Sequence, residues 1–74
     1  MIPPKSDPRW SRMLNNIGKV PVNNLSTRML MSRLKVMTLD KADTARQHAI
    51  EVAYEFFLKN EAIVQDDIRQ LLAQ

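Results

Sequence analysis

The residue best suited to chemistry in this chain is its single histidine, His48, because imidazole is the side chain that titrates near neutral pH. Glu51 follows it at a spacing that shares one helical face, and Glu55 lies one turn further on. A metal site needs about three or four ligands that converge from more than one element. The chain has no second histidine and no cysteine to complete such a set. We therefore predict a solvent-exposed histidine, no metal and no other cofactor.

Nucleophilic and phosphate chemistry also lack the residues they need. A serine nucleophile requires a neighbouring base, but the serines lie in the N-terminal half and His48 lies in the other half. Asp66 and Asp67 are adjacent, so on a helix they point about 100° apart and cannot form a matched acid–base pair. A helix start, where acidic residues are favourable, explains them. Gly18 is the only glycine, so no phosphate-cradling loop is present. We predict that the protein is not an enzyme.

Binding is the remaining class of function, and the segment 25–37 offers the first candidate surface. At about 100° per residue its apolar residues form two groups: Leu25, Met29 and Val36 on one side, and Leu30, Leu34 and Met37, with Met31 at the edge, on the other. A helix apolar on two sides is either central in its domain or touches a partner, and methionine suits adaptable surfaces. We predict contacts with a protein partner, or with a second copy of the chain, through Leu25, Met29, Met31 and Val36.

The charges suggest an alternative partner. The formal net charge is +3, but residues 1–38 contain seven Lys or Arg and one Asp, whereas residues 39–74 contain four Lys or Arg and seven Asp or Glu. This division is consistent with internal pairing of basic and acidic helices, with self-association, or with a basic surface for nucleic acid or another acidic partner. On the last hypothesis, phosphate contacts come from basic residues of the N-terminal half: Arg9, Arg12, Lys19, Arg28, Arg33 and Lys35.

The elements that must position these residues are predicted to be helices, because one glycine is too few for the tight turns of a compact β protein. The first helix is expected from Asp7 as N-cap to about Ile17, with Gly18 as its left-handed end. Pro21 marks an extended linker. The other helices are expected over about 25–37, from Thr38 or Asp40 to about 59, and over about 61–73.

These helices predict a small all-α domain of three or four helices, with orthogonal or bundle-like packing, over residues 7–74. Residues 1–6 contain two of the four prolines and are expected to form a flexible N-terminal lead. The expected core is made of large and small apolar residues from all four helices: Leu14, Leu34, Ala49, Ala53, Phe56, Phe57, Ile68 and Leu71.

Length and composition fit a single soluble domain. The 74 residues suit one domain, and the lack of cysteine favours a reducing compartment. The proline-rich N-terminus does not resemble a signal peptide, and the longest apolar runs fall far short of the roughly 20 residues of a membrane span. We expect a cytoplasmic protein that does not contact membrane. Its best-supported function is that of a non-enzymatic interaction module: an adaptor, assembly factor or small regulator.

Overall fold

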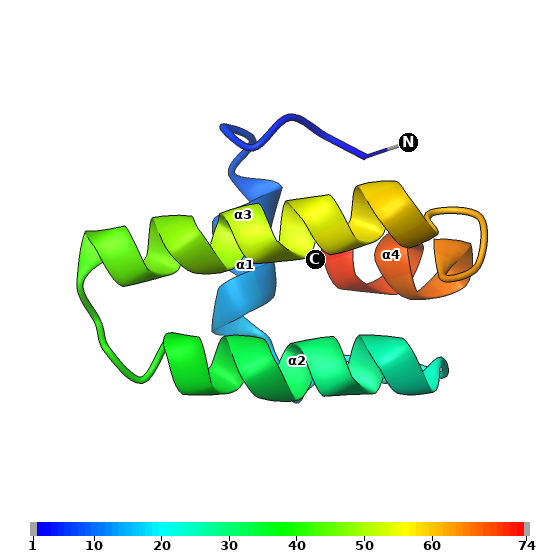
Figure 1. The fold of residues 1–74 in the computed structure, drawn as a ribbon, viewed down its shortest axis with the longest axis horizontal. Helices are drawn as coiled ribbons and strands as arrows, with labels where there is room; N and C mark the ends of the chain where they lie inside the picture. The colour runs from blue at the N-terminus through cyan, green and yellow to red at the C-terminus, as the bar shows by residue number, and fades with distance from the viewer. Residues whose placement is uncertain (1, 74) are drawn as a thin grey trace.

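The computed structural model describes residues 2–73, which contain four helices and no strand. Two antiparallel helices lie at the front in Figure 1, and a short helix crosses behind them. The short helix packs against the third and fourth helices, and the second packs against the third. The predicted small all-α domain is confirmed. Its helices are α1 (Arg9–Asn15), α2 (Leu25–Met37), α3 (Asp43–Asn60) and α4 (Gln65–Leu72).

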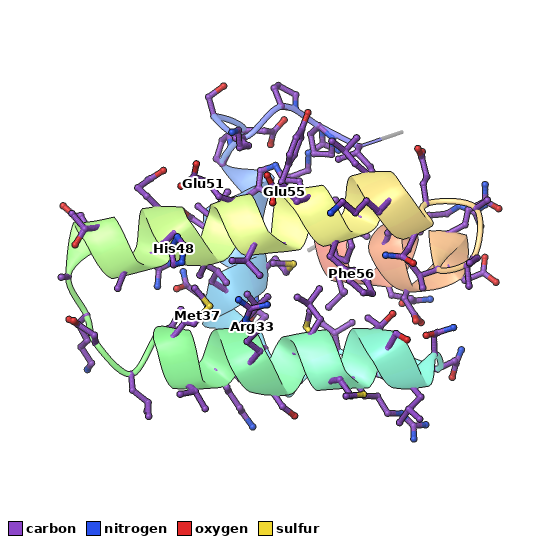
Figure 2. All side chains as sticks on the ribbon, viewed as in Figure 1. Arg33, Met37, His48, Glu51, Glu55 and Phe56 are labelled. Carbon is purple, nitrogen blue, oxygen red and sulfur yellow. The ribbon has the colours of Figure 1, made fainter. Side chains whose placement is uncertain are left out.

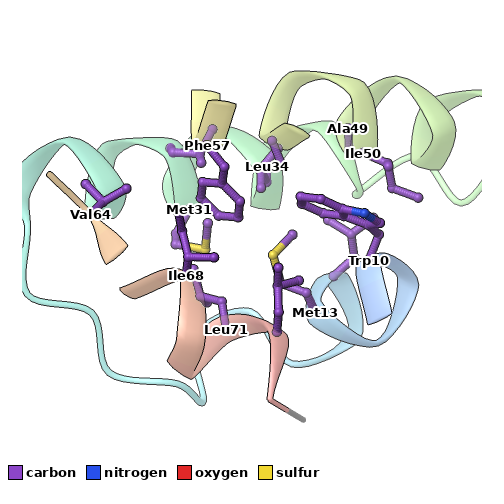
Figure 3. Close-up of a cluster of buried hydrophobic side chains, with 14 residues drawn as sticks. Trp10, Met13, Met31, Leu34, Ala49, Ile50, Phe57, Val64, Ile68 and Leu71 are labelled. Carbon is purple, nitrogen blue, oxygen red and sulfur yellow. The ribbon is translucent and has the colours of Figure 1, made fainter. Parts of the chain in front are cut away.

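The core is built around Trp10 of α1, which has no exposed surface. Its ring stacks on Phe57 at a centroid distance of 5.6 Å and meets Tyr54 edge-on at 5.9 Å. Ala49 and Ala53 of α3 are also fully buried, and their small side chains leave room for a neighbouring helix to approach. Figure 3 shows Trp10 and Phe57 within the cluster of buried side chains. The predicted core residues are buried with one exception, Phe56, which is half-buried.

Both ends of α1 differ from the prediction, because the N-cap is Pro8 and not Asp7, and the C-cap is Asn16. The Asp7 carboxylate accepts a hydrogen bond from the Arg9 backbone N–H at 2.9 Å, so Asp7 satisfies a free donor of the first turn. Pro8 has helical dihedral angles just before the helix. The helix ends at Asn15, earlier than expected, and a turn over residues 16–19 follows. Gly18 lies in this turn with φ of +89°, the left-handed conformation that its sequence position predicted.

Two later helices begin further along the chain than the sequence predicted. The Asp40 side chain accepts a hydrogen bond from the Ala42 N–H at 3.0 Å, so it stabilises the turn before α3 and does not cap the helix itself. The third helix starts at Asp43, and residues 61–64 form a turn that delays the start of α4 to Gln65.

Residues 2–6, part of the segment expected to form a flexible lead, contact α1 and α3 through Pro3, Pro4 and Lys5. We name this segment the N-terminal strap. The Trp10 indole N–H donates to the carbonyl oxygens of Pro4 at 3.0 Å and Pro3 at 3.3 Å. The Lys5 ammonium lies 5.5 Å from the centre of the Tyr54 ring and 3.9 Å from a Glu51 carboxylate oxygen. The strap therefore satisfies the one polar atom of the central aromatic side chain. Residue 1 lies outside the described residues.

Candidate protein-interaction surface

The outer face of α2 carries three large apolar side chains that the fold leaves in solvent. Leu25, Met29 and Val36 are 68%, 65% and 69% exposed. At about 100° per residue they fall within about 40° of one another around the helix, so they form one stripe. We call this stripe the α2 stripe. The fully buried Leu34 lies on the opposite side of the helix. The sequence left open which apolar group faces the core, and the structure assigns Leu25, Met29 and Val36 to the solvent.

Met31 does not belong to this surface. Its sequence position predicted a contact residue, but the structure places it in the core, where it is 8% exposed. Its position is about 160° around the helix from Met29, at about 100° per residue. It therefore points toward the buried side of α2. We remove Met31 from the candidate surface and keep the other three residues.

A shallow groove runs beside the α2 stripe, between α2 and α3. Part of it has a volume of about 440 Å³ and is lined by Ser26, Met29, Leu30, Arg33 and Phe56. Arg33 of α2 and Phe56 of α3 both point into the space between these helices in Figure 2. Phe56 was predicted to be central in the core. It is half-buried instead, because it forms part of the groove wall. Met29 belongs to both features, so the stripe and the groove form one continuous surface.

The start of α2 is fixed by two side chains. The Asn24 side chain accepts a hydrogen bond from the Ser26 N–H at 2.8 Å, as an N-cap does. From the far end of the chain, the Asp67 carboxylate accepts the backbone N–H groups of Asn23 at 2.8 Å and Asn24 at 3.1 Å. The sequence position of Asp67 predicted only a favourable place at the start of its own helix, so this contact was not expected. The contact joins α4 to the end of α2 that carries Leu25.

The Asp67 carboxylate is ionised in this setting. Burial on its own raises the pKa of Asp67, but the backbone hydrogen bonds from Asn23 and Asn24, together with two weaker contributions, lower the pKa below 3.8. The Thr27 hydroxyl and the Arg28 charge contribute in the same direction. The Thr27 side chain is fully buried, and its hydroxyl oxygen makes no hydrogen bond of ordinary geometry within residues 2–73. A negative charge is thus held at the positive N-terminal end of α2.

The basic residues of the alternative hypothesis are divided among several places. Arg33 lines the α2–α3 groove. On the other flank of α2, the Arg28 Nε donates to the Val22 carbonyl at 3.3 Å, and the Lys35 ammonium lies beside Gly18. The exposed Arg12 lies in α1, and the exposed Lys19 lies in the turn after it.

Arg9 is engaged at the start of α1. Its guanidinium donates to both oxygens of Asp7, at 3.1 Å and 3.0 Å. These side-chain hydrogen bonds, with that from the Arg9 N–H, lower the pKa of Asp7 to about 2. Arg9 also lines a separate hollow with residues of α4 that include Arg69. It therefore lies away from the cations of α2.

The three residues considered for metal binding, His48, Glu51 and Glu55, are exposed on α3. Glu51 is paired with Lys5 of the N-terminal strap. Across residues 2–73, no three His, Asp or Glu side chains gather closely enough to hold a metal ion. None of the helices in this part of the chain combines the length and apolar character needed to cross a bilayer.

Fold and surface together define a small all-α domain with one apolar helix face in solvent. No protein-family model matches the chain, and no curated protein sequence or solved structure matches it.

Proposed function

We propose that this protein is a small non-enzymatic protein-interaction module whose contact surface is the α2 stripe with the adjoining groove. The observation that supports this function is the exposure of Leu25, Met29 and Val36 on one face of a helix whose other face forms the core. Single exposed apolar residues are common and carry no meaning. A contiguous exposed patch, in contrast, is typical of a binding site.

The class of module is an adaptor, assembly factor or small regulator of the cytoplasm. The absence of cysteine supports a reducing compartment. A nucleic-acid-binding regulator is less well supported. The six basic residues that it would use are distributed over α1, the following turn and both flanks of α2, whereas phosphate binding favours cations clustered on one face.

A selection experiment tests the proposal and requires no identified partner. A display library of helical peptides is selected on the wild-type chain, and the enriched peptides are assayed against a variant with Leu25→Ser, Met29→Ser and Val36→Ser. We expect binding to fall at least tenfold in this variant. The control is Leu58→Ser, since Leu58 is 51% exposed and lies about 160° around α3 from Phe56, at about 100° per residue. It should bind like the wild type.

Stability measurements keep this test interpretable. Surface substitutions usually change the free energy of unfolding by no more than about 0.5 kcal/mol each, so the triple variant should retain a cooperative unfolding transition. Peptides that bind the folded triple variant as tightly as the wild type, or a failure to enrich any peptide, would contradict the proposed surface.

A further inference from the structure

The charges on α2 are all of one sign. Its sequence contains Arg28, Arg33 and Lys35 and no acidic residue. At about 100° per residue, Arg33 lies on one flank of the α2 stripe, and Arg28 and Lys35 lie on the other. A partner that covers the stripe therefore meets positive charge on both sides.

These cations are not neutralised by ion pairs within the domain. Among residues 2–73, the ion pairs are Lys5–Glu51, Arg9–Asp7 and Arg69–Asp66, and none involves α2. Arg28 is close enough to the Asp67 charge to lower its pKa, so part of its charge is offset. On the α3 side of the groove, Glu55 and Lys59 carry opposite charges. The positive character of the surface thus comes mainly from Arg33 and Lys35.

Size and charge both argue against a second copy that docks through its own α2 as the occupant. A two-fold contact of α2 against α2 would bring Arg28, Arg33 and Lys35 near the same residues of the other copy, and like charges across an interface are unfavourable. The 13 residues of α2 make a face about 20 Å long and about 10 Å wide. A stable complex of folded proteins needs about 800 Å² from each partner, so this face is better matched to a single helix than to a second domain.

We propose that the partner segment is an acidic amphipathic helix that lies along α2, with its apolar residues on the α2 stripe and groove and its carboxylates beside Arg33. This inference rests on the proposed function and adds the chemistry of the partner. It uses a common mode of recognition, in which an amphipathic helix places apolar anchors into a groove between helices. The flanking charges select the partner by sign.

The test uses two fluorescein-labelled synthetic helices with the same leucine stripe. The flanking positions are glutamate in the first peptide and lysine in the second, and binding to the full chain is followed by fluorescence anisotropy. We expect the acidic peptide to bind at least tenfold more tightly than the basic peptide, and its affinity to fall as salt is added. Arg33→Gln should weaken the acidic peptide several-fold. The matched control is Arg69→Gln, since Arg69 is exposed on α4, and it should leave the affinity unchanged.

Other outcomes separate this inference from the proposed function. Equal binding of both peptides, lost in Met29→Ser, would overturn the acidic partner and retain the docking surface. Binding of neither peptide, with a dimer in sedimentation equilibrium that Met29→Ser dissociates, would replace the acidic helix by a second copy. Binding only to vesicles of phosphatidylcholine and phosphatidylserine would overturn both proposals in favour of a membrane surface. A monomer that binds none of these probes would also overturn both.

Discussion

Replacement of Asp67 by asparagine should destabilise the domain far more than the loss of an ordinary surface carboxylate would. Asp67 is 3% exposed and accepts two backbone N–H groups ahead of α2. Asparagine keeps one acceptor oxygen, but its amide NH₂ is a donor and would face a backbone N–H. The variant therefore loses one hydrogen bond to a charged group, worth about 1.5–3 kcal/mol, and leaves a partly buried N–H without an acceptor. We expect a loss of about 2–3 kcal/mol, a large share of the stability of a domain this small.

Urea denaturation followed by Trp10 fluorescence measures this loss, because Trp10 is fully buried in the folded state. The matched control is Asp66→Asn at the neighbouring position. The Asp66 side chain is 82% exposed and pairs with Arg69 at the surface, and such pairs contribute no more than about 1 kcal/mol. A loss in Asp67→Asn that is no larger than in Asp66→Asn would refute the structural role of the buried carboxylate.

The pH dependence gives a second check on the same residue. The pKa of Asp67 is lowered from 3.8 in the folded state. A carboxylate with a lowered folded-state pKa stabilises the fold above its unfolded-state pKa, and this contribution is lost as pH falls through the folded-state value. The difference between wild type and Asp67→Asn should therefore be full at neutral pH and shrink below pH 3.8. A difference that stays constant to strongly acidic pH would show that the ionised carboxylate is not its cause.

Three further substitutions test the packing. Phe57→Ala removes a side chain with no exposed surface and should cost about 3–5 kcal/mol, seen as a lower thermal midpoint; an unchanged midpoint would contradict the core assignment. Gly18→Ala should cost about 1 kcal/mol, because φ of +89° strains any L residue, and urea denaturation would show it. Trp10→Phe removes the indole N–H that donates to the carbonyl oxygens of Pro3 and Pro4, so the amide signals of Ile2, Lys5 and Ser6 should lose their chemical-shift dispersion in the variant; retained dispersion would show that the strap is held by other contacts.

Most of the fold could be predicted from the sequence because each helix carries local signals. Leu25–Met37 begins at an asparagine cap and has the expected bounds. The alanines at positions 49 and 53 mark the packed side of α3, and both are fully buried. The predicted starts of α3 and α4 were wrong by several residues, because irregular backbone over residues 38–42 and a turn over residues 61–64 delay these helices. Both segments contain residues that are also acceptable in the first turn of a helix.

The candidate surface was less predictable because it depends on contacts between distant segments. Helical periodicity separates the two apolar groups of α2, but it does not reveal which group faces the core. Met31 lies between them on the helix, and only packing assigns it to the inside. The hydrogen bond between Asp67 and Asn23 joins residues 44 positions apart, and no local sequence pattern predicts it. The contacts of the N-terminal strap could not be predicted from the sequence. Its prolines favour irregular backbone, but they do not indicate that their carbonyl oxygens accept a hydrogen bond from the Trp10 indole N–H.

The hydrogen bonds between Asp67 and the backbone ahead of α2 make the exchange of two amides a measure of local opening. The N–H groups of Asn23 and Asn24 lie ahead of α2 and have their acceptors on α4. Deuterium exchange at these two amides therefore requires the fourth helix to separate from the start of the second. Amides within α2 exchange only when α2 itself unwinds. A comparison of the two sets of exchange rates would show whether α4 opens independently, as the partial unfolding units of small domains often do, or only with the whole domain.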